Sequence, residues 1–424
     1  MRRALKVVLL AVAGALAAVR GLASRGQAPA DAPARETRRD GSFGAWLKHQ
    51  LWTTAKYFAV FLVVMAVGGF LLAASGVIPI KASPGHWAVT RWLLQFSKQR
   101  SVSTNSLRID APPLDDARLV LKGAGAYETN CLACHGSPSL PAPRVARGMT
   151  PQPPYLPPTL SRYTDAEVFY IVKHGIKFTG MPAWPAQGRD DEVWAMVAFL
   201  RALPRLDAGG YERLVRGEAA ASGEVEPMPE MTGPRTVPRA IGVTCARCHG
   251  ADGLGRGAGA FPKLAGQSPE YLSLSLEAYA RSGRHSGVME PHAAGLNVEE
   301  MRELALYYAS LPKPTPTPPS QEMLLATQRG EAIARRGIPT RRVPSCVSCH
   351  GPGTAPRNPA YPDLTGQYAD YLILQLELFK QQQRGGTAYA HLMHTVAANL
   401  TPEQMRDVAL YYASLGSARE RPSP

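Results

Sequence analysis

The chain has 424 residues, too many for one ordinary hydrophobic core, and its 45% hydrophobic content is enough for most of it to fold. Its formal net charge of +14 is concentrated on both sides of one apolar segment near the N-terminus. This pattern is typical of membrane topology. It differs from the basic stripe of a nucleic-acid-binding domain, so we expect no nucleic-acid partner.

The first predicted element is a transmembrane helix at residues 58–80. These 23 residues carry no charge, and at a rise of ~1.5 Å per residue they span the ~30 Å hydrocarbon core of a bilayer. Lys56 precedes the segment and Lys81 follows it. A buried core helix is the alternative, but such helices rarely avoid polar residues over this length.

Residues 4–19 form another apolar stretch, which looks like the core of a signal peptide. Two spans, or a cleaved signal followed by one span, would return the bulk of the chain to the cytoplasm. The residues between the two stretches are rich in Arg and Lys and are expected to stay inside. We therefore predict a cytoplasmic extension at residues 1–57, a single span, and all later residues outside.

Residues 81–110 form a juxtamembrane segment. Between residues 86 and 100, apolar side chains suited to lipid alternate with basic ones suited to headgroups. The apolar ones are Trp87, Trp92, Leu93 and Phe96, and the basic ones are Arg91, Lys98 and Arg100. The segment is predicted either as an interfacial helix or as an ordinary amphipathic surface helix.

The remainder of the chain contains a repeat. Residues 245–311 and 346–415 share a Cys-x-x-Cys-His-Gly motif, an aromatic-Pro-x-Leu-x-Gly-Gln turn, a tyrosine-led helix and a closing helix that ends in Tyr-Tyr-Ala-Ser-Leu. Residues 131–203 form a looser copy. Proline-rich linkers separate the copies, because alternate prolines lack the amide donor that a helix or central strand needs. We place the three domains at residues 111–207, 211–313 and 320–417.

The looser copy has helices predicted at about 165–174 and 190–203. In the second of these, apolar residues at three- and four-residue spacing share one face. They are Val193, Met196, Val197 and Leu200.

All six cysteines belong to the three motifs, and each motif is followed at once by histidine. Two thiols at this spacing can add to the two vinyl groups of one porphyrin, and the next imidazole can reach its iron from the same side. Zinc sites and redox dithiols do not explain three such units with the same downstream helices. We predict three covalently bound haem c groups, held by Cys131 and Cys134, by Cys245 and Cys248, and by Cys346 and Cys349.

The predicted proximal iron ligands are His135, His249 and His350. A methionine from a later loop is expected opposite each, since a thioether raises the potential and a filled sixth position excludes substrates. The candidates are Met181, Met289 and Met393. The rivals are His285 or His292 for the second haem, His391 or His394 for the third and, less well placed, Met149 for the first. Met301 and Met405 are predicted core residues of the closing helices, and His174 a helix-terminus residue.

These motifs resemble class I cytochromes c. Residues 240–416, with CARCHGADG, FPKLAGQ, CVSCHGP and YPDLTGQ, are similar to periplasmic di-haem cytochromes c, and residues 111–207, with CLACHG and GMPAW, to a mono-haem domain. The resemblance implies an all-α fold: three class I cytochrome c domains in tandem behind one N-terminal transmembrane helix. It also implies axial His and Met ligands and the passage of single electrons to respiratory partners.

Two features depart from these families. Three haem motifs are also found in the cytochrome subunits of membrane alcohol and gluconate dehydrogenases, but here the anchor precedes the haem domains. Family members usually carry a helix just before the haem motif, whereas Pro234 and Pro238 interrupt that region in the second domain. We expect that helix to be displaced to about residues 211–221.

The favoured function is electron transfer in a respiratory chain, toward a terminal oxidase, at the periplasmic face of a bacterial inner membrane. The partners would be redox proteins and membrane lipid, and the chain would be a carrier and not an enzyme. The alternative within this class is a cytochrome subunit of an alcohol- or gluconate-type dehydrogenase. A peroxidase or nitrite reductase would need an open iron position, which the candidate methionines would fill.

Overall fold

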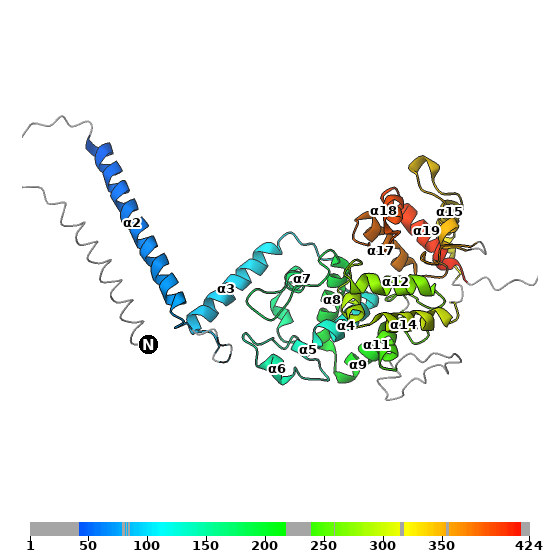
Figure 1. Cartoon of the computed structure of the whole chain (residues 1–424), viewed down its shortest axis with the longest axis horizontal. Helices are drawn as coiled ribbons and strands as arrows, with labels where there is room; N and C mark the ends of the chain where they lie inside the picture. The colour runs from blue at the N-terminus through cyan, green and yellow to red at the C-terminus, as the bar shows by residue number, and fades with distance from the viewer. Residues whose placement is uncertain are drawn as a thin grey trace, which may run out of the picture. The chain divides into compact units, whose positions relative to one another are not determined.

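The structure is a computed structural model, and it describes residues 42–78, 81, 83, 85–217, 239–257, 259–313, 318–352 and 356–416. The chain divides into two compact units, Met1–Pro84 and Gly85–Pro424 (Figure 1). Over the described ranges the regular structure is helical, and the only β-type pairing is an isolated bridge between Ile338 and Val343. The predicted all-α class is therefore confirmed. The apolar stretch at residues 4–19 lies outside the described residues.

The described part of the first unit is dominated by the helix α2, Ser42–Ala74. Its segment Gly44–Ala74 is long and apolar enough to cross a membrane, with a mean hydropathy of 2.4 and no buried residue in its most apolar window. The helix ends six residues before the predicted limit of 80. Ser75 donates from Oγ to the carbonyl of Leu72, and Gly76 adopts φ +67°, a left-handed conformation that ends helices.

The second unit begins with α3, Ala88–Asn105. Its apolar side chains Trp92, Leu93 and Phe96 are exposed, and the Trp92 and Phe96 rings stack with centroids 5.7 Å apart. Val102, near the C-terminal end, is buried. The helix therefore has an uncovered apolar surface over its first half and is held to the first domain by its second half.

The first domain is built on the crossing of its first and last long helices. Gly123 and Ala195 touch at this crossing, where a Cβ on Gly123 would collide with the Ala195 carbonyl and the Phe199 side chain. The helices of this domain are α4 (Ala117–Asn130), α5 (Leu132–His135), α6 (Arg144–Arg147), α7 (Asp165–His174), α8 (Asp190–Ala202) and α9 (Ala208–Arg216), with 3-10 turns η2 (Leu160–Arg162) and η3 (Leu203–Arg205). The helices predicted at 165–174 and 190–203 are confirmed.

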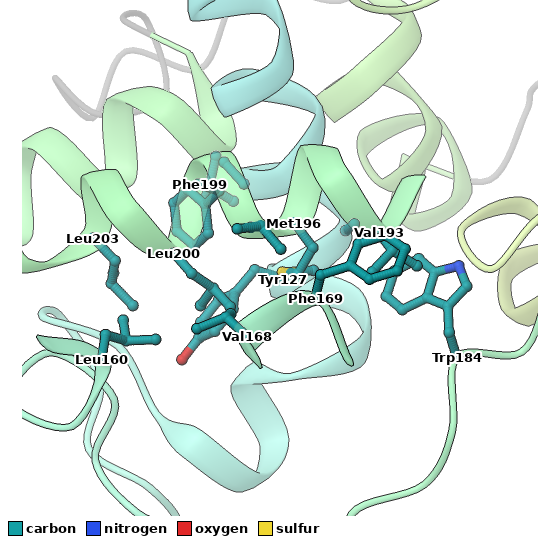
Figure 2. Close-up of a cluster of buried hydrophobic side chains, with 14 of the residues drawn as sticks. Tyr127, Leu160, Val168, Phe169, Trp184, Val193, Met196, Phe199, Leu200 and Leu203 are labelled. Carbon is teal, nitrogen blue, oxygen red and sulfur yellow. The ribbon is translucent and has the colours of Figure 1, made fainter. Parts of the chain in front are cut away.

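Figure 2 shows the core of this domain, in which the predicted face of α8 meets α4 and α7. Met196 is fully buried, and the Tyr127 and Phe199 rings lie 5.1 Å apart. Phe169 of α7 stacks on Trp194 at 4.3 Å. Val193, Val197 and Leu200 are also buried, as their spacing predicts.

The helix α9 lies in a different domain from the one expected. A helix was expected near residues 211–221 as the displaced first helix of the second domain. The structure instead has α9 at Ala208–Arg216, and its Tyr211 and Val215 pack in the core of the first domain. Tyr211 donates to Glu128 of α4 at 2.6 Å. Arg256 of the second domain donates to the carbonyls of Arg213, Leu214 and Val215, and so caps α9 from the other side.

From the haem motif onward, the second and third domains have the same helix order. The second contains α11 (Arg239–His249), α12 (Pro269–Ala280), α13 (Met289–Ala294) and α14 (Val298–Ser310). The third contains α15 (Leu324–Arg336), α16 (Val347–His350), α17 (Ala369–Lys380), α18 (Ala390–Ala398) and α19 (Pro402–Ser414), with η4 (Gln321–Met323) and η5 (Pro339–Arg341). Gly330 lies against the Asp407 carbonyl, so α15 crosses α19 as α4 crosses α8.

Candidate haem sites

Each Cys-x-x-Cys-His motif ends a helix, which is a single turn in the first and third domains (α5 and α16) and the longer α11 in the second, and the glycine after the histidine reverses the chain. Gly136, Gly250 and Gly351 have φ of 66°, 76° and 79°, where side chains are disfavoured. A tyrosine hydroxyl donates to the carbonyl of each of these glycines. The donors are Tyr127 to Gly136 (2.6 Å), Tyr308 to Gly250 (3.3 Å) and Tyr412 to Gly351 (2.8 Å). The same bond thus ties each motif to a long helix of its domain.

The three proximal histidines are oriented in the same way. The ring Nδ1 faces a proline carbonyl at hydrogen-bond distance: His135 to Pro154 (2.9 Å), His249 to Pro262 (3.0 Å) and His350 to Pro362 (2.9 Å). When Nδ1 donates its proton to this carbonyl, Nε2 keeps its lone pair for a metal. Pro262 and Pro362 belong to the repeated turn, whose role the sequence alone did not reveal.

The same histidines favour the neutral imidazole. Burial lowers the pKa of His135, His249 and His350, while the proline carbonyl opposes this shift in each case. The positive charge of Arg384 also lowers the pKa of His350, so Arg384 lies near the third site. A neutral imidazole is the form that ligates iron.

The thiols do not have the character of a redox dithiol. All six cysteines are free. Burial raises the pKa of Cys131 to about 12 and those of Cys245 and Cys346 to about 11. A disulfide oxidoreductase instead lowers the pKa of its attacking thiol. Over the described residues no group of His, Cys, Asp and Glu is arranged for a bare metal ion. Two thiols plus one oriented imidazole per motif therefore fit haem c.

The candidate methionines lie downstream of the motifs, in two different settings. Met181 lies in a loop, where its N–H donates to Thr179 and its carbonyl accepts from Ile176. Met289 begins α13 and Met393 lies within α18, so the expectation that all three lie in loops is wrong for these two. The residues around Met289 and Met393 include alanine, leucine and glutamate, which favour helix, and this local preference explains the difference. Met301 and Met405 are buried core residues, as predicted.

The rival ligands have other surroundings. His285 is exposed and lies 3.7 Å from Glu290, and His391 is exposed with Nδ1 near the Ala388 carbonyl. His292 Nε2 lies 3.1 Å from the Thr129 hydroxyl of the first domain. His394 Nε2 lies 2.6 Å from the Arg384 carbonyl.

Two remaining residues of interest lie beside the first site. The end of the Met149 side chain lies against Gly180, next to Met181. His174 ends α7 before Gly175, as predicted, and its ring lies 4.7 Å from that of Tyr170.

Helical domains around such motifs define a cytochrome that carries covalent haem and transfers electrons. A family model described as "Cytochrome C oxidase, cbb3-type, subunit III" matches residues 118–200, and one described as "Cytochrome c" matches residues 240–312 and 329–416. The chain belongs to the class I c-type cytochromes.

Its relatives include proteins named as cytochromes and as an electron acceptor. It is 37% identical to a "Thiosulfate dehydrogenase electron acceptor" of Thiomonas intermedia over 40% of this chain and 78% of the relative. It is 36% identical to a "Cytochrome c4" of Thiocapsa roseopersicina over 40% of this chain and 86% of the relative. The cytochrome c4 structure from Acidithiobacillus ferrooxidans matches 40% of this chain and 98% of its own, at 33% identity and a TM-score of 0.34.

Proposed function

We propose that this chain is a membrane-anchored tri-haem cytochrome c that passes single electrons from a dehydrogenase toward a terminal oxidase. The observation that carries the proposal is the threefold occurrence of one arrangement: two free thiols, then a histidine whose Nδ1 faces a proline carbonyl. Haem c, when bound there, supplies a one-electron redox centre. The chain holds it by two thioethers and one imidazole per domain.

Met181, Met289 and Met393 are the proposed sixth ligands. For the second and third haems, the surroundings of the rival histidines support this assignment. Nε2 of His292 and of His394 already lies at hydrogen-bond distance from an oxygen, and His285 and His391 are exposed. With every iron six-coordinate, the protein carries electrons and leaves no position for a substrate.

The proposed partners follow from what the chain is similar to. Electrons would leave through the first domain, which matches the oxidase-subunit model, toward an oxidase. They would enter through the second and third domains from a dehydrogenase, because a relative is named as the electron acceptor of thiosulfate dehydrogenase. That name also supports the second candidate function, a tightly bound cytochrome subunit of a dehydrogenase. Purification from detergent-solubilised membranes distinguishes the two, since only the subunit should retain a dehydrogenase through every column.

The helix α2 is the proposed single span, with the haem domains on the periplasmic side of a bacterial inner membrane. The exposed face of α3 is proposed to lie in the interface of that membrane. It presents Trp92 and Phe96, and its charged residues Arg91, Lys98 and Arg100 are all basic, which suits anionic headgroups.

Topology is tested with a reporter that is active only in the periplasm. Fused after Pro424 it should be active, and fused after Asp40 it should be inactive. The reverse pattern would eliminate the single-span arrangement. Haem content is tested separately by a pyridine haemochrome assay, which should give three haems per chain, and fewer than three would contradict the tri-haem proposal.

A further inference from the structure

The segment that leads to Met289, the proposed sixth ligand of the second haem, lies against the first domain. This segment is residues 285–288. The side chain of Asn130, at the end of α4, donates to the Gly287 carbonyl at 2.8 Å. Val288, the residue just before the methionine, packs on the hydrophobic core of the first domain. The surroundings of this segment are therefore built by two domains.

Glu192 of α8 is at the centre of this contact, and its carboxylate is approached at both oxygens. Oε1 accepts from the Ser286 hydroxyl at 2.6 Å and lies 3.0 Å from Arg189 Nη1. Oε2 accepts from the Gly287 N–H at 2.6 Å and from the Trp184 indole N–H at 3.1 Å. Two of these four donors belong to the first domain and two to the second.

The corresponding side chains of the other two domains have a local role. Glu300 of α14 and Gln404 of α19 stand at the N3 position, and each accepts from the backbone N–H that begins its own helix. In α8 the first residue of this kind is Arg189, whose N–H donates to the Ala186 carbonyl at 3.0 Å. Glu192 has the same N3 position and reaches the second domain instead.

Ser286 connects Glu192 to the methionine. Its hydroxyl proton is donated to Glu192, and its oxygen accepts the Met289 N–H at 3.1 Å. Met289 is the first residue of α13. Glu192 therefore fixes the start of this helix and, with it, the backbone that carries the methionine.

Trp184 brings a second ligand segment to the same place. It lies at the edge of the core of the first domain (Figure 2) and follows Met181 by three residues. A Cβ on Gly287 would collide with its indole ring, so the two segments are in close contact. The segments that carry the proposed sixth ligands of the first and second haems thus meet at Glu192.

The chemistry of this contact requires a carboxylate. The Glu192 side chain is only 10% exposed, and burial raises the pKa of its carboxyl while Arg189 opposes the shift. A buried carboxylate is costly unless it is hydrogen-bonded. Both of its oxygens accept, whereas an amide of the same size would turn an N–H₂ group toward one pair of donors. Glutamine is therefore a poor substitute in spite of its similar shape.

We infer that Glu192 is a positioning residue for Met289, so that iron ligation in the second domain depends on contact with the first. The inference rests on the proposed assignment of Met289 as the sixth ligand. It makes the first and second domains one unit for ligation, although each has its own haem motif.

The test uses full-length protein in detergent, first checked for three haems per chain, and measures carbon monoxide binding and the low-spin spectrum. Glu192→Gln leaves buried donors without an acceptor and should raise the population with an open sixth position on the order of tenfold. Carbon monoxide should then bind one haem in three. The double variant Glu192→Gln with Met289→Ala should also bind at one haem only, because both changes act on the same ligand.

The matched control is Glu300→Gln, the same change at the same helix position, where glutamine can still cap the helix. It should leave all three haems low-spin. Gly287→Ala keeps every polar group but places a methyl against the Trp184 indole. It should open the same haem, and it gives the measurement if Glu192→Gln loses haem.

A fully loaded Glu192→Gln or Gly287→Ala protein that binds carbon monoxide no better than the wild type would overturn the inference. A double variant with two open haems would also overturn it, since Glu192 would then act on the first haem through Trp184. Failure of Met289→Ala alone to open a haem would contradict the ligand assignment itself, and the inference with it.

Discussion

Gln267 and Gln367 hold each other's domains through matching pairs of hydrogen bonds. Gln267 donates to the Asp363 carbonyl at 2.8 Å and accepts from the Asp363 N–H at 2.9 Å. Gln367 donates to the Lys263 carbonyl at 2.9 Å and accepts from the Lys263 N–H at 3.1 Å. Both glutamines end the repeated aromatic-Pro-x-Leu-x-Gly-Gln turn, so that turn orients a proximal histidine and also joins the two domains.

Gln267→Ala or Gln367→Ala should therefore weaken this interface. Either change leaves a backbone N–H and a carbonyl without their partners, and should lower the free energy of unfolding by about 2 kcal/mol. The measurement is a denaturant titration of the detergent-solubilised chain followed by haem absorbance. Gln381→Ala, on an exposed residue of the third domain, is the control and should change the midpoint little. If all three substitutions lowered the free energy of unfolding equally, the hydrogen bonds of Gln267 and Gln367 would not be what stabilises the interface.

The methionine assignments predict a spectroscopic change. Replacing Met181, Met289 or Met393 singly with alanine should convert one haem in three to a high-spin form that binds carbon monoxide, because the sixth position opens. Met405→Leu, a volume-conserving change in the core of α19, should leave the low-spin spectrum intact. Stoichiometric carbon monoxide binding by the wild type would favour a catalytic haem protein over a relay.

The arginines ahead of the third motif predict a docking face for an acidic partner. Arg335, Arg336, Arg341 and Arg342 are all exposed. Arg341→Glu with Arg342→Glu should slow electron delivery at low salt and have little effect at high salt, where charges are screened over a Debye length of ~8 Å or less. The rate is measured by stopped flow with the purified partner.

The control for this experiment must come from surface residues of the second domain. Arg281 and Arg302 are exposed and suitable, whereas Arg284, although close in sequence to Arg281, is buried and would report on the interior. Arg281→Glu with Arg302→Glu should leave the rate unchanged. An equal slowing by both pairs would show that net charge, and not the third domain, governs the encounter.

Asp363 predicts a dependence of stability on pH. Burial acts to raise the pKa of its carboxyl, but Lys313 at 2.8 Å and the Thr365 N–H outweigh burial and lower it below the usual 3.8. A lowered folded-state pKa stabilises the fold above pH 3.8, and this contribution is lost as the pH falls through the folded-state value. Lys313→Gln should remove on the order of 1 kcal/mol or less at pH 7, since Lys313 is partly exposed, and should flatten the curve below pH 4. A steeper acid transition in the variant would contradict this assignment.

Much of the fold was predictable because the same sequence motifs and helix patterns occur more than once in the chain. The apolar spacing of Val193, Met196, Val197 and Leu200 predicted a buried helix face. The shared Tyr-Tyr-Ala-Ser-Leu endings predicted the closing helices α14 and α19. The domain to which α9 belongs was not predictable from the sequence. Tyr211 follows a proline-containing turn and could pack against either the first or the second domain. The structure shows that its partner is Glu128, more than eighty residues earlier.

The haem motifs were predictable from spacing alone, but their surroundings were not. A carbonyl that orients a histidine can belong to any residue, so Pro154, nineteen residues after His135, carried no signal. The burial of Arg284 and Arg384 was equally hidden, because arginine is ordinarily a surface residue and their contacts depend on how two domains meet.

Gly283 and Gly386 touch where the second and third domains meet, and a Cβ on Gly386 would collide with the Gly283 carbonyl group. This contact has a consequence for the history of the chain. After most duplications, each copy is free to change while the other preserves the original role. Here the two copies form each other's interface, so a side chain gained in one loop would displace the backbone of its twin. Exchange of one half for that of a distant relative should therefore fail at this contact when the incoming loop lacks the glycine, even when both halves carry intact haem motifs.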